Sequence, residues 1–201
     1  MNFDTVRKNL EALGYAVSCF QTAEEAVAYL DRQIDGVTVG IGGSMTVEEM
    51  GLYSRLACHN DVYWHQHPPK GSTGQEIRDA ASAAEVYISS VNALAQTGEI
   101  VNIDGMCNRV ASVLYGHGRV YLVVGKNKLA EDYDSAVWRA RNVAAPKNAR
   151  RLGRNTPCAV KADRCYNCKS PERICRALTV LWSKPMASSY EVVLIDEELG
   201  Y

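Results

Sequence analysis

The sequence contains no apolar run that approaches the roughly 18 residues needed for a helix to span a membrane. Residues 1–15 carry charges along their length, and no uninterrupted apolar segment follows them, so they predict an amphipathic helix rather than a secretory signal peptide. We therefore expect a cytoplasmic protein with no membrane partner. Because a reducing compartment disfavours disulfides, clustered cysteines in such a chain indicate metal binding or thiol chemistry.

An excess of charge of either sign is also absent. The chain has 22 Lys and Arg residues against 23 Asp and Glu residues, for a formal net charge of -1. A nearly neutral protein has no global field that recruits nucleic acid, so we expect no nucleic-acid partner, and any basic site must be local. There are no internal repeats or low-complexity linkers. With 201 residues and 47% hydrophobic content, the chain is predicted to form a single domain over 1–201.

Segments typical of strands alternate with segments typical of helices. Apolar residues at helical spacing predict helices at 2–13, 22–33, 44–52, 75–84, 108–116 and 132–150. Apolar runs predict strands at 15–20, 36–41, 61–66, 86–90, 119–125 and 190–196, with two more joined by a turn in 93–104. Residues 173–182 fit either a helix or a strand. This alternation predicts an α/β, Rossmann-like fold, with a mostly parallel sheet and helices on both faces.

A glycine-rich turn joins one predicted strand directly to a helix at Gly42, Gly43 and Ser44. Glycines let the backbone approach a ligand closely, and a helix N-terminus attracts an anion such as a phosphate or a carboxylate. The turn has neither a Walker lysine nor a complete dinucleotide fingerprint. A purely structural turn is the alternative, with Ser44 or Thr46 as N-cap, because Thr46 and Glu49 have the spacing of a capping box.

A second group of polar residues follows a predicted strand and includes Asn102, Asp104, Asn108 and Arg109. In parallel sheets, loops at the carboxyl ends of strands line the ligand crevice. Asp104 could act as a general base, and Arg109 could bind a carboxylate or phosphate through two hydrogen bonds. The alternative is that the Asn and Asp residues form turns and that Arg109 belongs to a surface ion pair.

Two further groups of polar side chains lie outside these loops. Lys126, Asn127 and Lys128 follow a buried strand and supply positive charge for an anionic ligand; among them, Lys126 is the predicted ligand-binding residue. His65 and His67 alternate on a predicted strand, where a solvated edge is favoured over a metal site.

Four of the seven cysteines lie in residues 155–176, a segment rich in Arg, Lys, Asn and Cys and too poor in aliphatics to build its own core. Cys165 and Cys168 can chelate one metal centre from a single turn, and Cys158 and Cys175 complete a four-sulfur shell. Metal binding would offset the entropy of ordering this segment. Ser170 predicts the start of a helix directly after the pair.

Other interpretations of these cysteines remain open. Cys165 and Cys168 could form a redox dithiol, or the four thiols could be unrelated to one another. If they bind a metal, zinc and a 4Fe–4S cluster both accept four thiolates.

Three runs of the sequence resemble one known family. They are GIGGSMTVEEMGL, TGEIVNIDGMCNRVASVLYGHGRVYLVVGKNKL and CYNCKSPERIC, and the second is the most specific. The chain resembles the LUD-domain family, of the lactate-utilisation protein C type, from about residue 3 to its end. The resemblance implies a fold like that of ribose-5-phosphate isomerase and the CoA transferases, with a phosphate-binding glycine loop. Some members of the family act in oxidising L-lactate to pyruvate beside separate iron–sulfur subunits, which favours a 4Fe–4S cluster over zinc.

The resemblance also implies a set of site residues. Those carried over are Gly42, Gly43, Ser44, Thr97, Gly98, Glu99, Asn102, Asp104, Gly105, Asn108 and Arg109. The chain has Met106 and Cys107 where a glycine is expected. Glu99 has the residue type of a CoA-transferase nucleophile, but such a nucleophile needs a glycine-lined oxyanion site and only Gly98 is near it in sequence. The candidate catalytic residues are thus Glu99, Asp104 and Arg109.

Two functions follow from this pattern. The first is an enzyme or oxidoreductase subunit that binds a small anionic or phosphorylated metabolite, acts in hydroxy-acid oxidation and works with iron–sulfur partner subunits or as a homo-oligomer. The second is an electron-transfer or regulatory accessory protein with a structural zinc site and no catalytic activity.

Overall fold

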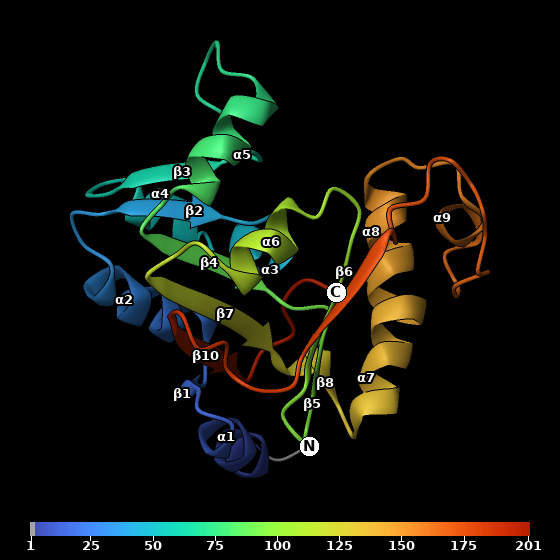
Figure 1. Cartoon of the computed structure of the whole chain (residues 1–201), viewed down its shortest axis with the longest axis horizontal. Helices are drawn as coiled ribbons and strands as arrows, with labels where there is room; N and C mark the ends of the chain where they lie inside the picture. Colours follow the sequence, from blue (N-terminus) through green and yellow to red (C-terminus); the bar gives the residue numbers. More distant parts are fainter. Residues whose placement is uncertain (1–2) are drawn as a thin grey trace.

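Six parallel strands form the large sheet of the protein (Figure 1), which we describe from a computed structural model covering residues 3–201. In spatial order the strands are β1 (Ala16–Phe20), β10 (Ser189–Ile195), β7 (Arg119–Gly125), β4 (Val86–Ser90), β2 (Thr38–Ile41) and β3 (Asp61–Trp64). Every neighbouring pair in this sheet is parallel. All six strands were predicted from the sequence to within two residues at either end.

Helices cover both faces of this sheet. The α-helices of the described residues are α1 (Phe3–Ala12), α2 (Ala23–Gln33), α3 (Met45–Glu49), α4 (Leu52–Leu56), α5 (Gly74–Ser82), α6 (Asn108–Leu114), α7 (Tyr133–Arg139), α8 (Ala145–Arg151) and α9 (Pro157–Lys161). Successive residues of β7 alternate between two cores: Tyr121 and Val123 pack with α2, α3 and α4, whereas Val120 and Leu122 pack with α1 and α6. The predicted α/β class and the predicted covering of both faces are therefore confirmed. No helix within residues 3–201 is both long and apolar enough to cross a membrane.

A second, smaller sheet was not predicted. It contains β8 (Leu129–Ala130), β5 (Ala93–Ala95), β6 (Ile100–Asp104) and β9 (Ala177–Leu181), and both neighbours of β6 run antiparallel to it. A small core of alanines and Val101 joins this sheet to α7. Because alanines have little periodic contrast, the sequence pattern did not show that these strands leave the large sheet.

Several element boundaries differ from the sequence prediction. The helix predicted at 44–52 is interrupted at Gly51, whose φ of 67° is left-handed, and α4 starts after it. Ser44, rather than Thr46, caps α3 by accepting a hydrogen bond from the Val47 amide. The helix predicted to start at Ser170 is wrong, because residues 171–176 form turns that lead into β9. Of the helix predicted at 2–13, residue 2 lies outside the described residues.

Gly40 is a position where the fold requires glycine. A Cβ atom there would lie 2.3 Å from the Ala81 carbonyl oxygen and 2.9 Å from the Tyr87 ring. We predict that Gly40→Ala lowers the free energy of unfolding by about 1–3 kcal/mol through overpacking. Gly118→Ala is the matched control, because its Cβ has no contact closer than 3.6 Å, and its effect on the urea midpoint should be small. Equal midpoint shifts in the two variants would contradict this account.

Candidate functional site

A cavity of about 310 Å³ lies at the carboxyl edge of the large sheet, where β2 and β4 end. From β2 the chain crosses to β3 on one side, and from β4 it continues to β7 on the other, so the strand order reverses between β2 and β4. Such a reversal opens a crevice between the loops that leave the two strands. Here Gly43 and Ser44 follow β2, Ser90 ends β4 and Asn92 follows it, and all four line the cavity.

The glycine loop forms one wall of this cavity. The Gly42 amide donates a hydrogen bond to the Ile88 carbonyl (2.9 Å), and a Cβ on Gly42 would lie 2.9 Å from the Tyr87 hydroxyl. The Ser44 amide donates to Gln66 Oε1 at 2.9 Å. Because these two amides have partners inside the protein and α3 has only five residues, the loop shapes the cavity and does not present a row of free amides.

Arg109 and Asp104 form a nearly buried ion pair beside the glycine loop; a Cβ on Gly42 would lie 3.0 Å from Arg109 Cγ. Their side chains are 12% and 11% exposed, and Arg109 Nε donates to Asp104 Oδ2 at 3.1 Å. The other carboxylate oxygen of Asp104 accepts the amide of Cys107 (3.0 Å), a residue held at a left-handed φ of 67°. Asn102, which is buried, accepts a further hydrogen bond from Arg109 Nη1 at 3.1 Å. The structure thus brings together Asn102, Asp104 and Arg109, and Asn108 lines the same cavity.

Lys128 is the buried basic residue of the cavity. Its side chain comes from the 3-10 turn that follows β7, and the residue is 3% exposed. Nζ donates hydrogen bonds to Thr46 Oγ1 (2.7 Å) and Ser90 Oγ (2.8 Å). The Thr46 hydroxyl donates its own proton to the Leu199 carbonyl at 3.2 Å, so it acts as an acceptor toward Lys128.

Burial, together with the nearby cations Arg139 and Arg109, lowers the pKa of Lys128 to about 7. Lys126, the lysine that the sequence favoured as a ligand-binding residue, lies elsewhere. It is exposed, pairs with Asp196 at 3.1 Å and does not line the cavity. The two lysines are two positions apart after the same strand, and residue type alone did not distinguish them.

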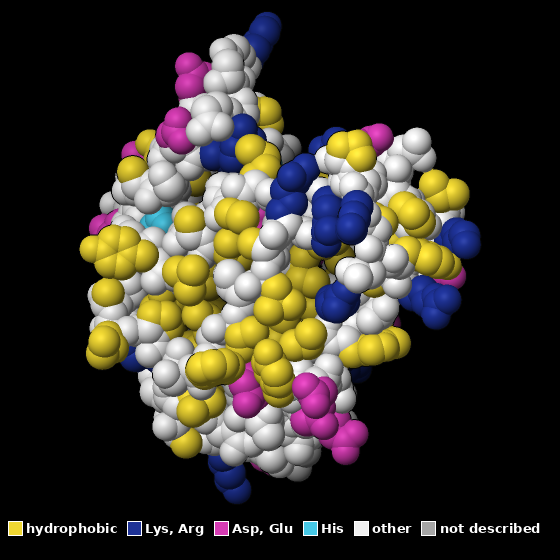
Figure 2. All heavy atoms as spheres, turned by 45° about the vertical axis from the view of Figure 1, so that its right-hand side comes forward, with side chains coloured by type: hydrophobic (Ala, Val, Ile, Leu, Met, Phe, Trp, Pro, Cys, Tyr) yellow, Lys and Arg dark blue, Asp and Glu magenta, His cyan; other side chains and the backbone are white. Residues whose placement is uncertain are grey.

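Arginines from distant parts of the chain complete the cavity. Arg78 comes from α5, Arg151 ends α8 and Arg154 follows it, and all three line the cavity. Figure 2 shows Lys and Arg side chains gathered around the hollow between the projecting α5 end and the α8 side. Arg78 Nε is buried and has no hydrogen-bond partner among the described residues. His65, predicted at a solvated edge, also lines the cavity; burial, with Arg78 and Arg151, lowers its pKa.

Three residues implied by the family resemblance lie away from this cavity. Thr97, Gly98 and Glu99 form the turn between β5 and β6, at the opposite end of β6 from Asp104. The Thr97 hydroxyl donates to the Glu99 carboxylate, and a Cβ on Gly98 would lie 2.5 Å from the side chain of Leu13. Glu99 is thus not brought together with Asp104 and Arg109.

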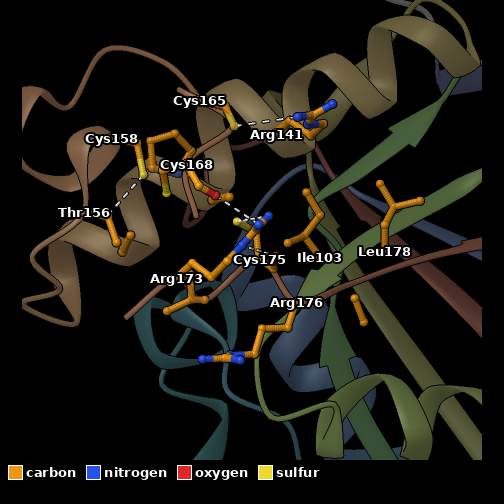
Figure 3. Close-up of a pocket in the computed structure, with 15 residues that line it drawn as sticks. Ile103, Arg141, Thr156, Cys158, Cys165, Cys168, Arg173, Cys175, Arg176 and Leu178 are labelled. Atoms are coloured by element: carbon orange, nitrogen blue, oxygen red, sulfur yellow. Dashed lines mark hydrogen bonds between the residues drawn. The ribbon is translucent and has the colours of Figure 1, made fainter. Parts of the chain in front are cut away.

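A second cavity, of about 290 Å³, is lined by all four cysteines of the C-terminal segment (Figure 3). Cys158 lies in α9, whereas Cys165, Cys168 and Cys175 come from the irregular chain between α9 and β9. This segment lies on the far side of α8 from the large sheet (Figure 1). Among residues 3–201, no three His, Cys, Asp or Glu side chains are grouped closely enough to hold a single metal ion.

Two arginines and a backbone amide face the sulfur atoms. Arg173 Nη2 donates to Cys175 Sγ at 3.3 Å, and its Nη1 donates to the Cys168 carbonyl at 3.0 Å. Arg141 Nη2 lies 3.9 Å from Cys165 Sγ, and the Asn167 amide donates to the same sulfur at 3.4 Å. N–H donors of this kind stabilise anionic sulfur ligands.

The two cavities share a wall. Ile103 and Ile174 line both of them. The backbone of Ile174 passes so close to Gly105 that a Cβ on this glycine would lie 2.8 Å from the Ile174 carbonyl oxygen. Arg176, two residues after Ile174, donates a hydrogen bond from its backbone amide to the Asp104 carbonyl at 2.9 Å. The cysteine segment therefore packs directly on the loop that carries Asp104.

Comparisons with known proteins bear on the family and the fold. A family model described as "LUD domain" matches residues 4–195. The structure is similar to a crystal structure of a DUF162 family protein from Deinococcus radiodurans, with a TM-score of 0.55, 12% identity and coverage of 96% of this chain and 95% of that chain. A weaker similarity, with a TM-score of 0.33 and 14% identity, is to eIF2B beta from Chaetomium thermophilum, covering 66% of this chain and 44% of that chain. No curated protein sequence matches the chain.

The pKa of Lys128 predicts a pH-dependent stability. Because folding lowers this pKa from 10.5 to about 7, the unfolded chain binds one proton more than the folded chain between these pH values. The contribution of Lys128 to stability should therefore rise with pH across that window and stay constant below it. We predict that Lys128→Met flattens this rise in urea unfolding measured across the window, whereas Lys126→Met leaves it unchanged. A rise that persists in Lys128→Met would show that other groups cause it.

Proposed function

The chain belongs to the LUD domain family, as its sequence motifs predicted, and from this premise we propose that it binds a small anionic metabolite beside a four-cysteine iron–sulfur centre. The observation that carries the proposal is the shared wall: a cavity lined by basic residues lies directly against a cavity lined by four cysteines. The lactate-utilisation members of the family suggest oxidation of a 2-hydroxy acid as the process that these two sites serve.

The charge of the first cavity supports an anionic ligand. Among the described lining residues, Asp104 has the one acidic side chain, and that carboxylate is paired with Arg109. Lys128, Arg78, Arg151 and Arg154 thus remain without a carboxylate among the lining residues. Carboxylates and phosphates make strong, charge-assisted hydrogen bonds to such groups. The unpartnered Nε of Arg78 supports the same class of ligand.

The donor set of the second cavity supports an iron–sulfur cluster. Cys158, Cys165, Cys168 and Cys175 would hold it, one thiolate on each iron. A cluster is larger than a single ion, so its ligands need not converge on one point, as four zinc ligands must at about 2.3 Å from the metal. A bound cluster would supply one-electron transfer. The protein's own contribution is to hold the sulfurs around one cavity and to place the cationic Arg141 and Arg173 beside them.

The anion site can be tested by thermal shift with phosphate, hydroxy acids, oxo acids and CoA esters. We predict that at least one of these anions stabilises the protein and that Arg151→Gln with Arg154→Gln weakens its binding by about ten-fold or more, since a hydrogen bond to a charged group contributes about 1.5–3 kcal/mol. Arg150→Gln is the matched control, because this exposed residue of α8 does not line the cavity. If no anion stabilises the wild-type protein, the binding proposal is wrong.

The metal centre can be tested on anaerobically prepared full-length protein by metal analysis and visible spectroscopy. We expect a brown protein that contains iron and inorganic sulfide and whose visible absorbance is bleached by dithionite. Cys168→Ser should lose the cluster, whereas Cys58→Ser, at an exposed and isolated cysteine, should retain it. A colourless protein with stoichiometric zinc, or a protein that binds no metal under these conditions, would overturn the iron–sulfur assignment.

A further inference from the structure

We propose that Lys128 is a nucleophile that forms an imine with the ligand, and that the ligand is therefore an oxo acid, which carries both a carbonyl and an acid group. The inference rests on the proposed anion site and specifies the ligand that this site takes.

The amine of Lys128 is held in position at the cavity. Nζ donates to Thr46 Oγ1 (2.7 Å) and Ser90 Oγ (2.8 Å), and the residue is 3% exposed although it lines the cavity. These hydroxyls come from α3 and from the end of β4, so two separate elements fix the direction of the side chain. The two hydroxyls accept two of the hydrogens of Nζ, and the residue itself lines the cavity.

No counter-ion neutralises this amine within the described part of the chain. Among the ion pairs of residues 3–201, none includes Lys128. Three charged groups shift the pKa of Lys128: Arg139 from α7 and Arg109 from α6 lower it, and Glu49 from α3 raises it with the smallest effect. The Glu49 carboxylate itself accepts a hydrogen bond from the Gly200 amide. Burial without a counter-ion favours the neutral amine, which is the nucleophilic form of lysine.

The pKa supports this geometry. With a pKa of about 7, close to half of Lys128 is neutral at neutral pH. An ordinary lysine, with a pKa of about 10.4, is neutral in only about 1 part in 2,500 under the same conditions. Lys128 therefore presents on the order of 1,000 times more free amine than an ordinary exposed lysine.

The chemical step is a condensation. The Nζ lone pair attacks the carbonyl carbon, an N–C bond forms, the C=O π bond breaks, and one proton passes from nitrogen to the oxygen to give a carbinolamine. The C–O bond then breaks, and hydroxide leaves with the remaining nitrogen proton as water to give the imine, with no oxidant or reductant required. The acid group of the same ligand would face the arginines, because Arg78, Arg151 and Arg154 line the cavity together with Lys128. A neutral ketone lacks this second anchor, and a simple acid lacks the carbonyl.

Trapping the imine tests the inference. Full-length protein is incubated with pyruvate or glyoxylate, the smallest oxo acids of the ketone and aldehyde types, and reduced with sodium cyanoborohydride at neutral pH. We expect a secondary amine on Lys128 whose added mass is that of the acid minus one oxygen atom, located by peptide mapping. Its yield should be at least ten-fold above that on Lys126, in line with the difference in free amine. Acetone should give little adduct, and oxalate, which has no ketone or aldehyde, should compete.

Two variants separate this inference from the proposed anion site. Lys128→Arg retains the positive charge and removes the nucleophile, so it should lose the adduct; Lys126→Arg should keep it. If Lys128→Arg does not fold, the position of the adduct on the wild-type protein still tests the imine. If an oxo acid raises the melting temperature of the wild type but labels no lysine, or labels Lys126 as much as Lys128, the imine is wrong and the anion site stands. If no anion raises the melting temperature, both fail.

Discussion

Both cavities depend on the hydrogen bonds that the Arg109 guanidinium group donates. All five of its N–H donors are used inside the protein, on Asp104, Asn102, Asn92 and the carbonyl oxygens of Ser90 and Ile103. These acceptors belong to the end of β4 and to β6, so one side chain from α6 ties the large sheet to the small sheet. Arg109 therefore positions the walls of the cavity, and in the proposed function the other arginines would bind the anion.

The small sheet also holds one end of the cysteine segment in place. β9 pairs with β6 over five residues and ends the segment that contains the four thiols. Gly105 lets the Ile174 backbone approach the β6–α6 loop. Arg173 donates hydrogen bonds to the carbonyl oxygens of Cys168 and Cys175, on either side of it in the sequence. A segment without an apolar core of its own is thus held at one end by strand pairing, and metal binding would hold it at the cavity.

The sequence predicted what depends on local patterns. Apolar periodicity located the strands of the large sheet. The four cysteines predicted to bind a metal line one cavity, and metal binding by them stays a prediction. The sequence predicted two strands within 93–104 but not that they form a separate small sheet, because strand patterns do not show which sheet a strand joins. It also did not identify Arg78, Arg151 or His65 at the anion site, because only the fold brings α5, α8 and the end of β3 together. The sequence favoured Lys126; identifying Lys128 as the lysine of the cavity requires knowing which side chain is buried, and residue type does not reveal this.

The burial of Lys128 links stability to function. An amine that sits among Arg109 and Arg139 without a carboxylate destabilises the folded state when it is protonated. Exchanging Lys128 for an apolar residue would remove that cost but leave the Thr46 and Ser90 hydroxyls without their nitrogen donor. A ligand with a carbonyl and an acid group relieves the cost in a different way, since the imine satisfies the nitrogen and the acid group compensates the surrounding positive charge. The lack of a counter-ion thus lowers the stability of the folded protein when the cavity is empty, and the same lack would strengthen the binding of an oxo acid.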